Sequence, residues 1–182
     1  MTWLRIVVIP LLVWVYYMPE AWLTAHEKNL TGTILFVAAA VTDWLDGYLA
    51  RRLGQTSAFG AFLDPVADKL IVAAALIVLV ELGRAPAWVA VVIIGREIAI
   101  SALREWMARI GKTRNVAVNM VGKVKTIAQM IAIPMLLYCE PIGPWFDPCL
   151  HGGWLLLVAA VLTLVSMFYY LKLALPSLSE GA

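Results

Sequence analysis

Residues 43–51 and 60–68 of the chain read DWLDGYLAR and GAFLDPVAD, and they place four carboxylates inside an otherwise apolar sequence. The four residues are Asp43, Asp46, Asp64 and Asp68. A carboxylate in the middle of a membrane helix costs about 3 kcal/mol and usually has a function. These two segments are therefore the first place to look for both the fold and the site.

The composition of the 182-residue chain is that of a membrane protein. Hydrophobic residues make up 63% of it, charged residues make up 14%, and the mean hydropathy is +0.86. A soluble domain is typically about half apolar and about one quarter charged. This balance argues against a soluble fold.

Six apolar stretches are each long enough to cross a bilayer as a helix, at about twenty residues per crossing. They are residues 3–24, 30–49, 65–82, 86–110, 116–138 and 154–175. The stretches leave no room for a separate soluble domain. We therefore expect residues 1–182 to form one all-α integral membrane domain with six transmembrane helices.

Lysine and arginine gather on one side of these predicted spans. The second and fourth connections, with the helix ends beside them, hold Arg51, Arg52, Arg109, Lys112, Arg114, Lys123 and Lys125. The other three connections hold only Lys28 and Arg84. Because basic residues favour the cytoplasmic side, we expect the second and fourth connections and both termini to face the cytoplasm.

Helical spacing places the aspartates of each segment on one helix face. Asp43 and Asp46 lie three residues apart, and Asp64 and Asp68 lie four residues apart. The two helices are antiparallel, so their carboxylates should meet on the cytoplasmic side. Since polar groups at membrane depth are tolerated only where they line a cavity, we expect a polar cavity open to the cytoplasm. Pro65 could also mark a helix start that is capped by Asp64.

Four converging carboxylates require cations. Without them, mutual repulsion and desolvation would raise the carboxyl pKa values until the groups were protonated. Oxygen ligands with no histidine or cysteine nearby suit a hard ion such as Mg²⁺ or Mn²⁺. Two ions that share carboxylates would form the clamp used for phosphoryl displacement, so we expect two.

Written as a pattern, D-x-x-D-G-x-x-A-R, eight residues, then G-x-x-x-D-x-x-x-D resembles the signature of the CDP-alcohol phosphatidyltransferase family at every defined position. Members of that family transfer a phosphatidyl or similar group from a CDP-linked donor to an alcohol and release CMP. They have a six-helix membrane fold and usually form homodimers. The resemblance implies these features for this chain.

The resemblance also implies a role for each matched residue. The metal ligands would be Asp43, Asp46, Asp64 and Asp68. Asp68 would in addition be the catalytic base that takes the proton of the acceptor hydroxyl. The residues around the CMP part of the donor would be Asp43, Asp46, Gly47, Ala50, Arg51 and Gly60.

Basic residues of the fourth and fifth predicted spans and their connection favour an acceptor that carries a phosphate. They are Arg96, Arg104, Arg114, Lys123 and Lys125. Phosphate is held best by arginine forks or by lysine point charges. The alternative is that Arg96 and Arg104 pair with the adjacent Glu97 and Glu105, and that the lysines contact lipid headgroups.

Further segments resemble one bacterial branch of the family, so that the resemblance covers residues 2–171. They are residues 41–44, 59–69, 95–97, 101–107 and 122–126. In that branch the donor is CDP-diacylglycerol, the acceptor is sn-glycerol 3-phosphate, and the products are phosphatidylglycerol phosphate and CMP. Such proteins commonly have a short amphipathic segment before the threonine and arginine seen here as Thr2 and Arg5.

The resemblance also implies a location and partners. We expect a multi-pass protein of the bacterial inner (cytoplasmic) membrane whose active site faces the cytoplasm. Its partners would be the two substrates, the lipid bilayer and a second copy of the chain, and we expect no nucleic acid.

Other functions remain open at this point. The same chemistry could use inositol phosphate or serine as the acceptor. An intramembrane magnesium-dependent prenyltransferase would normally carry a second aspartate-rich motif, and none follows Asp68. A cation carrier should show polar interruptions in both halves of the chain, whereas the four aspartates of the two segments lie in one half.

Cys139 and Cys149 flank the last non-cytoplasmic connection. An oxidising compartment would allow them to form a disulfide, and two free thiols are the alternative.

Overall fold

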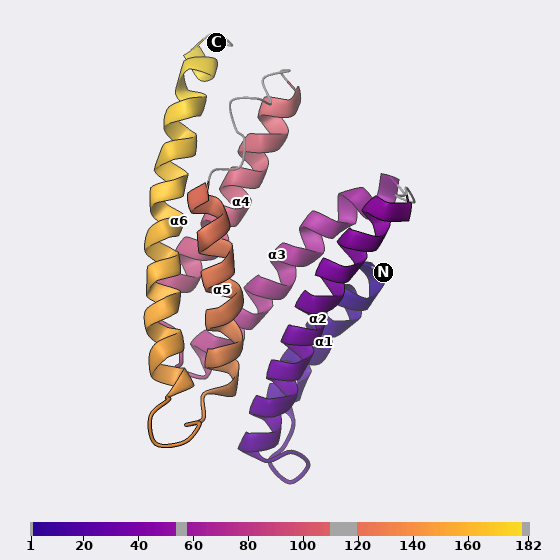
Figure 1. Cartoon of the computed structure of the whole chain (residues 1–182), viewed down its shortest axis with the longest axis vertical. Helices are drawn as coiled ribbons and strands as arrows, with labels where there is room; N and C mark the ends of the chain where they lie inside the picture. The colour runs from indigo at the N-terminus through magenta and orange to yellow at the C-terminus, as the bar shows by residue number, and fades with distance from the viewer. Residues whose placement is uncertain (1, 54–57, 110–119, 180–182) are drawn as a thin grey trace.

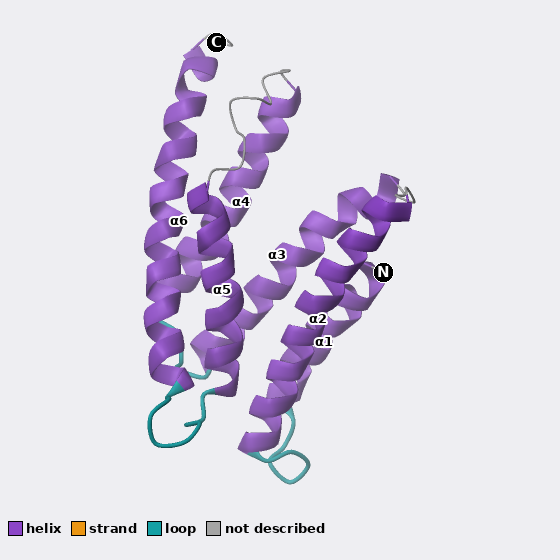
Figure 2. Ribbon diagram, viewed as in Figure 1, coloured by secondary structure: helices purple, strands orange, loops and turns teal. Residues whose placement is uncertain are grey.

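The computed structural model of the protein describes the backbone of residues 2–53, 58–109 and 120–179. Within these ranges, the side chains at 2–4, 44, 46–53, 58–62, 64, 120–121, 123 and 173–179 are outside the described part. The described residues form six helices and no strand, which confirms the all-α prediction (Figures 1 and 2). The helices are α1 (Thr2–Tyr17), α2 (Ala25–Leu53), α3 (Ala58–Glu81), α4 (Ala87–Arg109), α5 (Met120–Tyr138) and α6 (Pro148–Ser179).

Local signals explain why some helices begin or end away from the predicted limits. The helix α1 stops at Tyr17, where Pro19 disfavours a helical backbone at the preceding Met18. Thr24 and Glu27 form a capping box at the start of α2, where the Glu27 nitrogen donates to Thr24 Oγ1 at 3.3 Å and the Thr24 nitrogen donates to Glu27 Oε2 at 2.8 Å. The helix therefore begins five residues before the predicted apolar stretch.

The interpretation of Pro65 as a helix start is wrong. The helix α3 begins at Ala58 and runs through Pro65. Proline removes one backbone hydrogen bond from the helix, and helices of membrane proteins tolerate this where neighbouring groups compensate.

Among the described residues, one helical segment is long and apolar enough to cross a membrane by itself, namely Pro148–Lys172 in α6, with a mean hydropathy of 2.1. Arg5–Tyr17 and Val124–Tyr138 are shorter apolar segments. Charged residues interrupt the apolar runs of α2, α3 and α4. The prediction of six spans therefore remains a prediction.

The outer surface of the helices is apolar. In α6 the exposed large apolar side chains recur every three or four residues, at Trp154, Val158, Val161, Val165 and Phe168. A similar stripe runs along α2, at Leu30, Ile34, Val37, Val41 and Leu45. A helix that is apolar on both its inner and its outer face is typical of contact with lipid, because a soluble helix would carry polar residues on the outside.

The main core lies toward one end of the helices. It combines side chains from all six helices, including Leu12, Phe36, Leu79, Val89, Ile133, Leu136 and Leu156. A much smaller cluster of Ile100, Met107 and Tyr170 joins α4 to α6 toward the other end. Figure 1 shows that α1, α2 and α3 diverge from α4, α5 and α6 toward the end at which α2 finishes and α3 begins.

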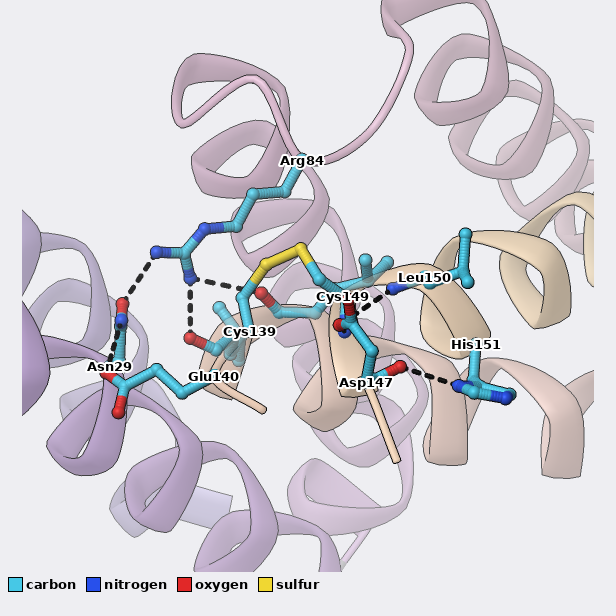
Figure 3. Close-up of a disulfide and its surroundings, with 10 residues drawn as sticks. Asn29, Arg84, Cys139, Glu140, Asp147, Cys149, Leu150 and His151 are labelled. Atoms are coloured by element: carbon cyan, nitrogen blue, oxygen red, sulfur yellow. Dashed lines mark hydrogen bonds between the residues drawn. A yellow bond between two sulfur atoms is a disulfide. The ribbon is translucent and has the colours of Figure 1, made fainter. Parts of the chain in front are cut away.

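Polar contacts fasten the end that carries the main core. Arg84, between α3 and α4, donates to the carbonyl oxygen of Leu137 at 2.6 Å and to Asn29 Oδ1 at 2.8 Å (Figure 3). Asn29 donates in turn to Glu140 Oε1 at 3.0 Å. Hydrogen bonds with Asn29 and with His26 hold the pKa of the Glu140 carboxyl below its usual range. These contacts join α2, α5 and the α3–α4 connection.

The connection between α5 and α6 is closed covalently. Cys139 and Cys149 form a disulfide, which settles the alternative between a bond and two free thiols (Figure 3). Asp147 caps α6, because its Oδ1 accepts the backbone N–H groups of Cys149 at 2.8 Å and Leu150 at 3.2 Å.

Close packing of α5 on α6 depends on Gly152. A Cβ at this position would lie 3.0 Å from Met135 Cβ and 3.2 Å from the Ala132 carbonyl oxygen, whereas a Cβ at Gly153 would meet nothing within 4 Å. Small residues allow membrane helices to approach in this way.

We predict that Gly152→Val destabilises the protein and that Gly153→Val does not to the same extent. Both substitutions place a β-branched residue in the same helix, so the difference between them isolates the steric effect. Overpacking should lower the free energy of unfolding of Gly152→Val by about 1–3 kcal/mol relative to Gly153→Val. Thermal unfolding of the purified variants in detergent would measure it, and equal melting temperatures would contradict it.

Candidate functional site

Arg5, in the first turn of α1, contacts two of the predicted site aspartates. Its Nη1 donates to Asp68 Oδ1 at 2.6 Å, and its Nη2 forms an ion pair with Asp43 Oδ1. The Arg5 side chain is 4% exposed, whereas the side chains of Asp43 and Asp68 are 36% and 46% exposed. One buried guanidinium therefore connects α1, α2 and α3, and both carboxylates keep an accessible side.

The antiparallel arrangement of α2 and α3 accounts for this meeting. Asp43 lies ten residues before the end of α2, and Asp68 lies ten residues after the start of α3. Equal distances from the connection place the two side chains at the same depth. The remaining predicted metal and donor residues, Asp46, Gly47, Ala50, Arg51, Gly60 and Asp64, have side chains outside the described part of the structure.

The described pair suits a hard divalent cation. Both side chains offer carboxylate oxygens, which are the ligands that Mg²⁺ and Mn²⁺ prefer. Both contact the guanidinium of Arg5, and the one positive and two negative charges of these three residues sum to −1. We call these three residues the Arg5 trio. The described side chains contain no group of three or more that could ligate a metal, and the side chains of Asp46 and Asp64 lie outside the described part.

A second polar cluster lies among α4, α5 and α6. It surrounds a cavity of about 140 Å³ that is lined by Arg96, Glu97, Arg104, Gly122, Lys125, Thr126 and Tyr170. The three cations outnumber the single carboxylate, so the lining carries a net charge of +2. We call this cavity the cationic pocket.

Glu97 joins two of the cations. Its Oε1 pairs with Lys125 Nζ, and Arg96 Nη1 lies 3.3 Å from the same oxygen. Arg96 also donates from Nη2 to Ser166 Oγ at 2.9 Å. Arg96 and Lys125 are buried, with 6% and 3% exposure. Burial makes these charges strong partners for an anion, because less water screens them.

Tyr170 organises the arginines. Its ring is fully buried, and the guanidinium carbons of Arg96 and Arg104 lie 5.7 Å and 5.3 Å from the ring centre. Arg104 also donates to the Tyr170 hydroxyl at 3.3 Å. These cation–π contacts hold the two arginines beside each other despite their like charge.

The structure thus brings together three of the five basic residues proposed for an acceptor phosphate. Arg114 and Lys123 lie outside the described side chains. The alternative that each arginine pairs with the adjacent glutamate holds for Arg96, which pairs with Glu97. It does not hold for Arg104, which contacts Tyr170, because Glu105 pairs with Arg109 at 2.8 Å.

Sequence reasoning missed three contributors to these clusters. Arg5 entered only as an arginine of the family pattern near the N-terminus, and its role was missed because its partners lie 38 and 63 positions away. Ser166 and Tyr170 were overlooked inside the apolar sixth stretch. They lie one helical turn apart there, and that spacing of polar atoms was the available signal.

Comparisons with known proteins agree with the signature. A family model described as CDP-alcohol phosphatidyltransferase matches residues 1–165. Proteins named CDP-diacylglycerol–glycerol-3-phosphate 3-phosphatidyltransferase from Escherichia coli (strain K12) and from Salmonella typhimurium are each 49% identical to the chain over 177 residues. These alignments cover 96% of this chain and 92% of each relative.

We predict that the cationic pocket binds a small dianion. Sulfate should raise the melting temperature of the protein more than chloride does at equal ionic strength, because ligand binding stabilises the folded state. Arg104→Gln should reduce this difference. Arg109→Gln removes the same charge from an exposed side chain, and this variant should keep the wild-type difference between sulfate and chloride. An equal response of both variants to sulfate would contradict the prediction.

Proposed function

Because the chain belongs to the CDP-alcohol phosphatidyltransferase family, we propose that it transfers the phosphatidyl group of CDP-diacylglycerol to sn-glycerol 3-phosphate. The products are phosphatidylglycerol phosphate and CMP. The observation that carries this proposal is the identity with relatives named for that reaction over nearly the whole chain. The two polar clusters supply chemistry that fits it.

The cationic pocket supports the choice of a phosphorylated acceptor. The phosphate of glycerol 3-phosphate carries a charge of about −1.5 to −2 near pH 7, which complements the +2 lining. Arg96, Arg104 and Lys125 would bind this phosphate, and Arg114 and Lys123 would add to the set.

The other acceptors fit less well. Serine has no phosphate for the pocket to bind. Inositol phosphate has one, so the pocket alone does not separate it from glycerol 3-phosphate, and the names of the relatives favour the latter.

The four aspartates of the signature would hold two Mg²⁺ or Mn²⁺ ions. Asp43 and Asp68 supply ligands from α2 and α3, and Asp46 and Asp64 would complete the set. When bound, the ions neutralise charge on the diphosphate of the donor and on the group that is transferred. Asp43, Asp46, Gly47, Ala50, Arg51 and Gly60 would surround the CMP part of the donor.

Asp68 is the proposed catalytic base. Its carboxylate accepts the proton of the C1 hydroxyl of glycerol 3-phosphate as that oxygen attacks the phosphorus attached to diacylglycerol. The new bond joins the C1 oxygen to phosphorus, and the bond between phosphorus and the CMP oxygen breaks. The contact of Asp68 Oδ1 with Arg5 leaves the carboxylate 46% exposed, so a hydroxyl can reach it.

The membrane arrangement belongs to the same proposal. All 182 residues form one domain whose six helices span the bacterial inner membrane, with a polar cavity open to the cytoplasm and a second copy as partner. The apolar stripes on the outside of α2 and α6 and the basic second and fourth connections support it. Membership of the family argues against the prenyltransferase and the cation carrier.

CMP release by the purified protein tests the proposal. The protein would be assayed in detergent with CDP-diacylglycerol and Mg²⁺ or Mn²⁺, in parallel with glycerol 3-phosphate, inositol phosphate, serine and no acceptor. We expect release that requires both a divalent metal and glycerol 3-phosphate. Release of CMP with a different acceptor would change the assigned substrate. If folded protein released no CMP with any of the acceptors, the transferase function would be refuted.

We predict that Asp68→Asn lowers turnover by about 10²–10⁴-fold, as expected for the loss of a general base. The variant should remain folded and should still bind Mn²⁺ through the other aspartates. Asp147→Asn changes an aspartate that caps α6 at the opposite end and should keep its turnover. Wild-type turnover in Asp68→Asn would remove the base assignment.

A further inference from the structure

The buried guanidinium of Arg5 is held in position because burying an unpaired charge is energetically unfavourable. A guanidinium with 4% exposure is stable only where anionic or hydrogen-bonding groups compensate for its lost hydration. Asp43 and Asp68 provide two such groups, from two different helices. The position of Arg5 and the positions of the two carboxylates are therefore mutually dependent.

The shape of the guanidinium makes this dependence geometrically specific. Asp68 Oδ1 contacts Nη1, and Asp43 Oδ1 contacts Nη2. The two nitrogens are held at a fixed distance in one rigid plane, so the contacts set the separation of the two oxygens. The single ammonium of a lysine carries the same charge but has no such fork.

The two aspartates contact a buried arginine and also keep solvent-accessible surface. Arg5 is enclosed, whereas the two carboxylates are 36% and 46% exposed. A divalent cation and an acceptor hydroxyl would therefore approach the accessible surface of these carboxylates. A buried partner that orients a ligating carboxylate commonly changes metal affinity or activity by about 10–100-fold when it is lost.

We propose that Arg5 is a positioning residue for phosphatidyl transfer, whose fork fixes the separation and orientation of Asp43 and Asp68 so that their accessible sides can bind a divalent cation. The inference rests on the proposed roles of these two aspartates. Arg5 acts through them and needs no contact with either substrate.

The test compares Arg5→Lys with Arg84→Lys in the full-length protein in detergent. Arg84 is the matched control because its fork also joins separate elements, through the Leu137 carbonyl and Asn29, but at the opposite end of the helices. Binding of Mn²⁺ alone would be measured by electron paramagnetic resonance, without substrates. The kcat and KM of CMP release would be measured separately.

We expect Arg5→Lys to raise the half-saturating Mn²⁺ concentration by about 10–100-fold and to lower kcat, with little change in KM for glycerol 3-phosphate. Arg84→Lys should keep the Mn²⁺ affinity of the wild type, even if it loses thermal stability. Arg5→Gln, which lacks both the charge and the fork, should lose at least as much Mn²⁺ affinity as Arg5→Lys.

Several outcomes would overturn the inference. Unchanged Mn²⁺ affinity in folded Arg5→Lys would make the contact merely structural, and tighter binding would make Arg5 a competitor of the metal. Failure of both Arg5 variants to fold would assign the residue to stability alone. Failure of the wild type to bind Mn²⁺ would instead refute the proposed metal site, so the two failures are distinguishable.

Discussion

The contact of the Arg5 guanidinium with the carboxylates of Asp43 and Asp68 is the interaction on which this architecture depends. It places a buried cation among α1, α2 and α3, in surroundings where an uncompensated charge would be too costly. It also explains how two carboxylates from different helices can lie near each other before any metal arrives. The same electrostatic compensation thus serves the folding of these helices and the assembly of the site.

The two polar clusters have opposite net charges, and each is carried by a different set of helices. The Arg5 trio on α1–α3 is negative, whereas the cationic pocket on α4–α6 is positive. The first sign suits metal ions that accompany a nucleotide diphosphate, and the second suits the phosphate of an acceptor. Under the proposed function, this separation would keep the acceptor phosphate from competing with the carboxylates for the metal ions, while the acceptor hydroxyl would lie near Asp68.

The sequence was informative where the determinants are local. Helical spacing and the antiparallel arrangement anticipated that the carboxylates of Asp43 and Asp68 come together, and apolar length anticipated six helices. The spacing of residues along one helix does not reveal contacts between distant segments. The contacts of Arg5 with the two aspartates and the arrangement of the arginines around Tyr170 were therefore missed. Pro65 misled for a related reason, since its effect on a helix depends on neighbouring groups that one segment does not reveal.

The uneven distribution of the core has a mechanical consequence. The main core, the Arg84 contacts and the Cys139–Cys149 bond all lie toward one end, and the helices diverge toward the other (Figure 1). A small rotation about the packed end would therefore produce a larger displacement at the diverging ends of the helices. An 18-residue arm of helix is about 27 Å long, so a rotation of about 5° would move its free end by about 2 Å. Rotations that scarcely disturb the packing at the packed end would therefore change the distance between the Arg5 trio and the cationic pocket.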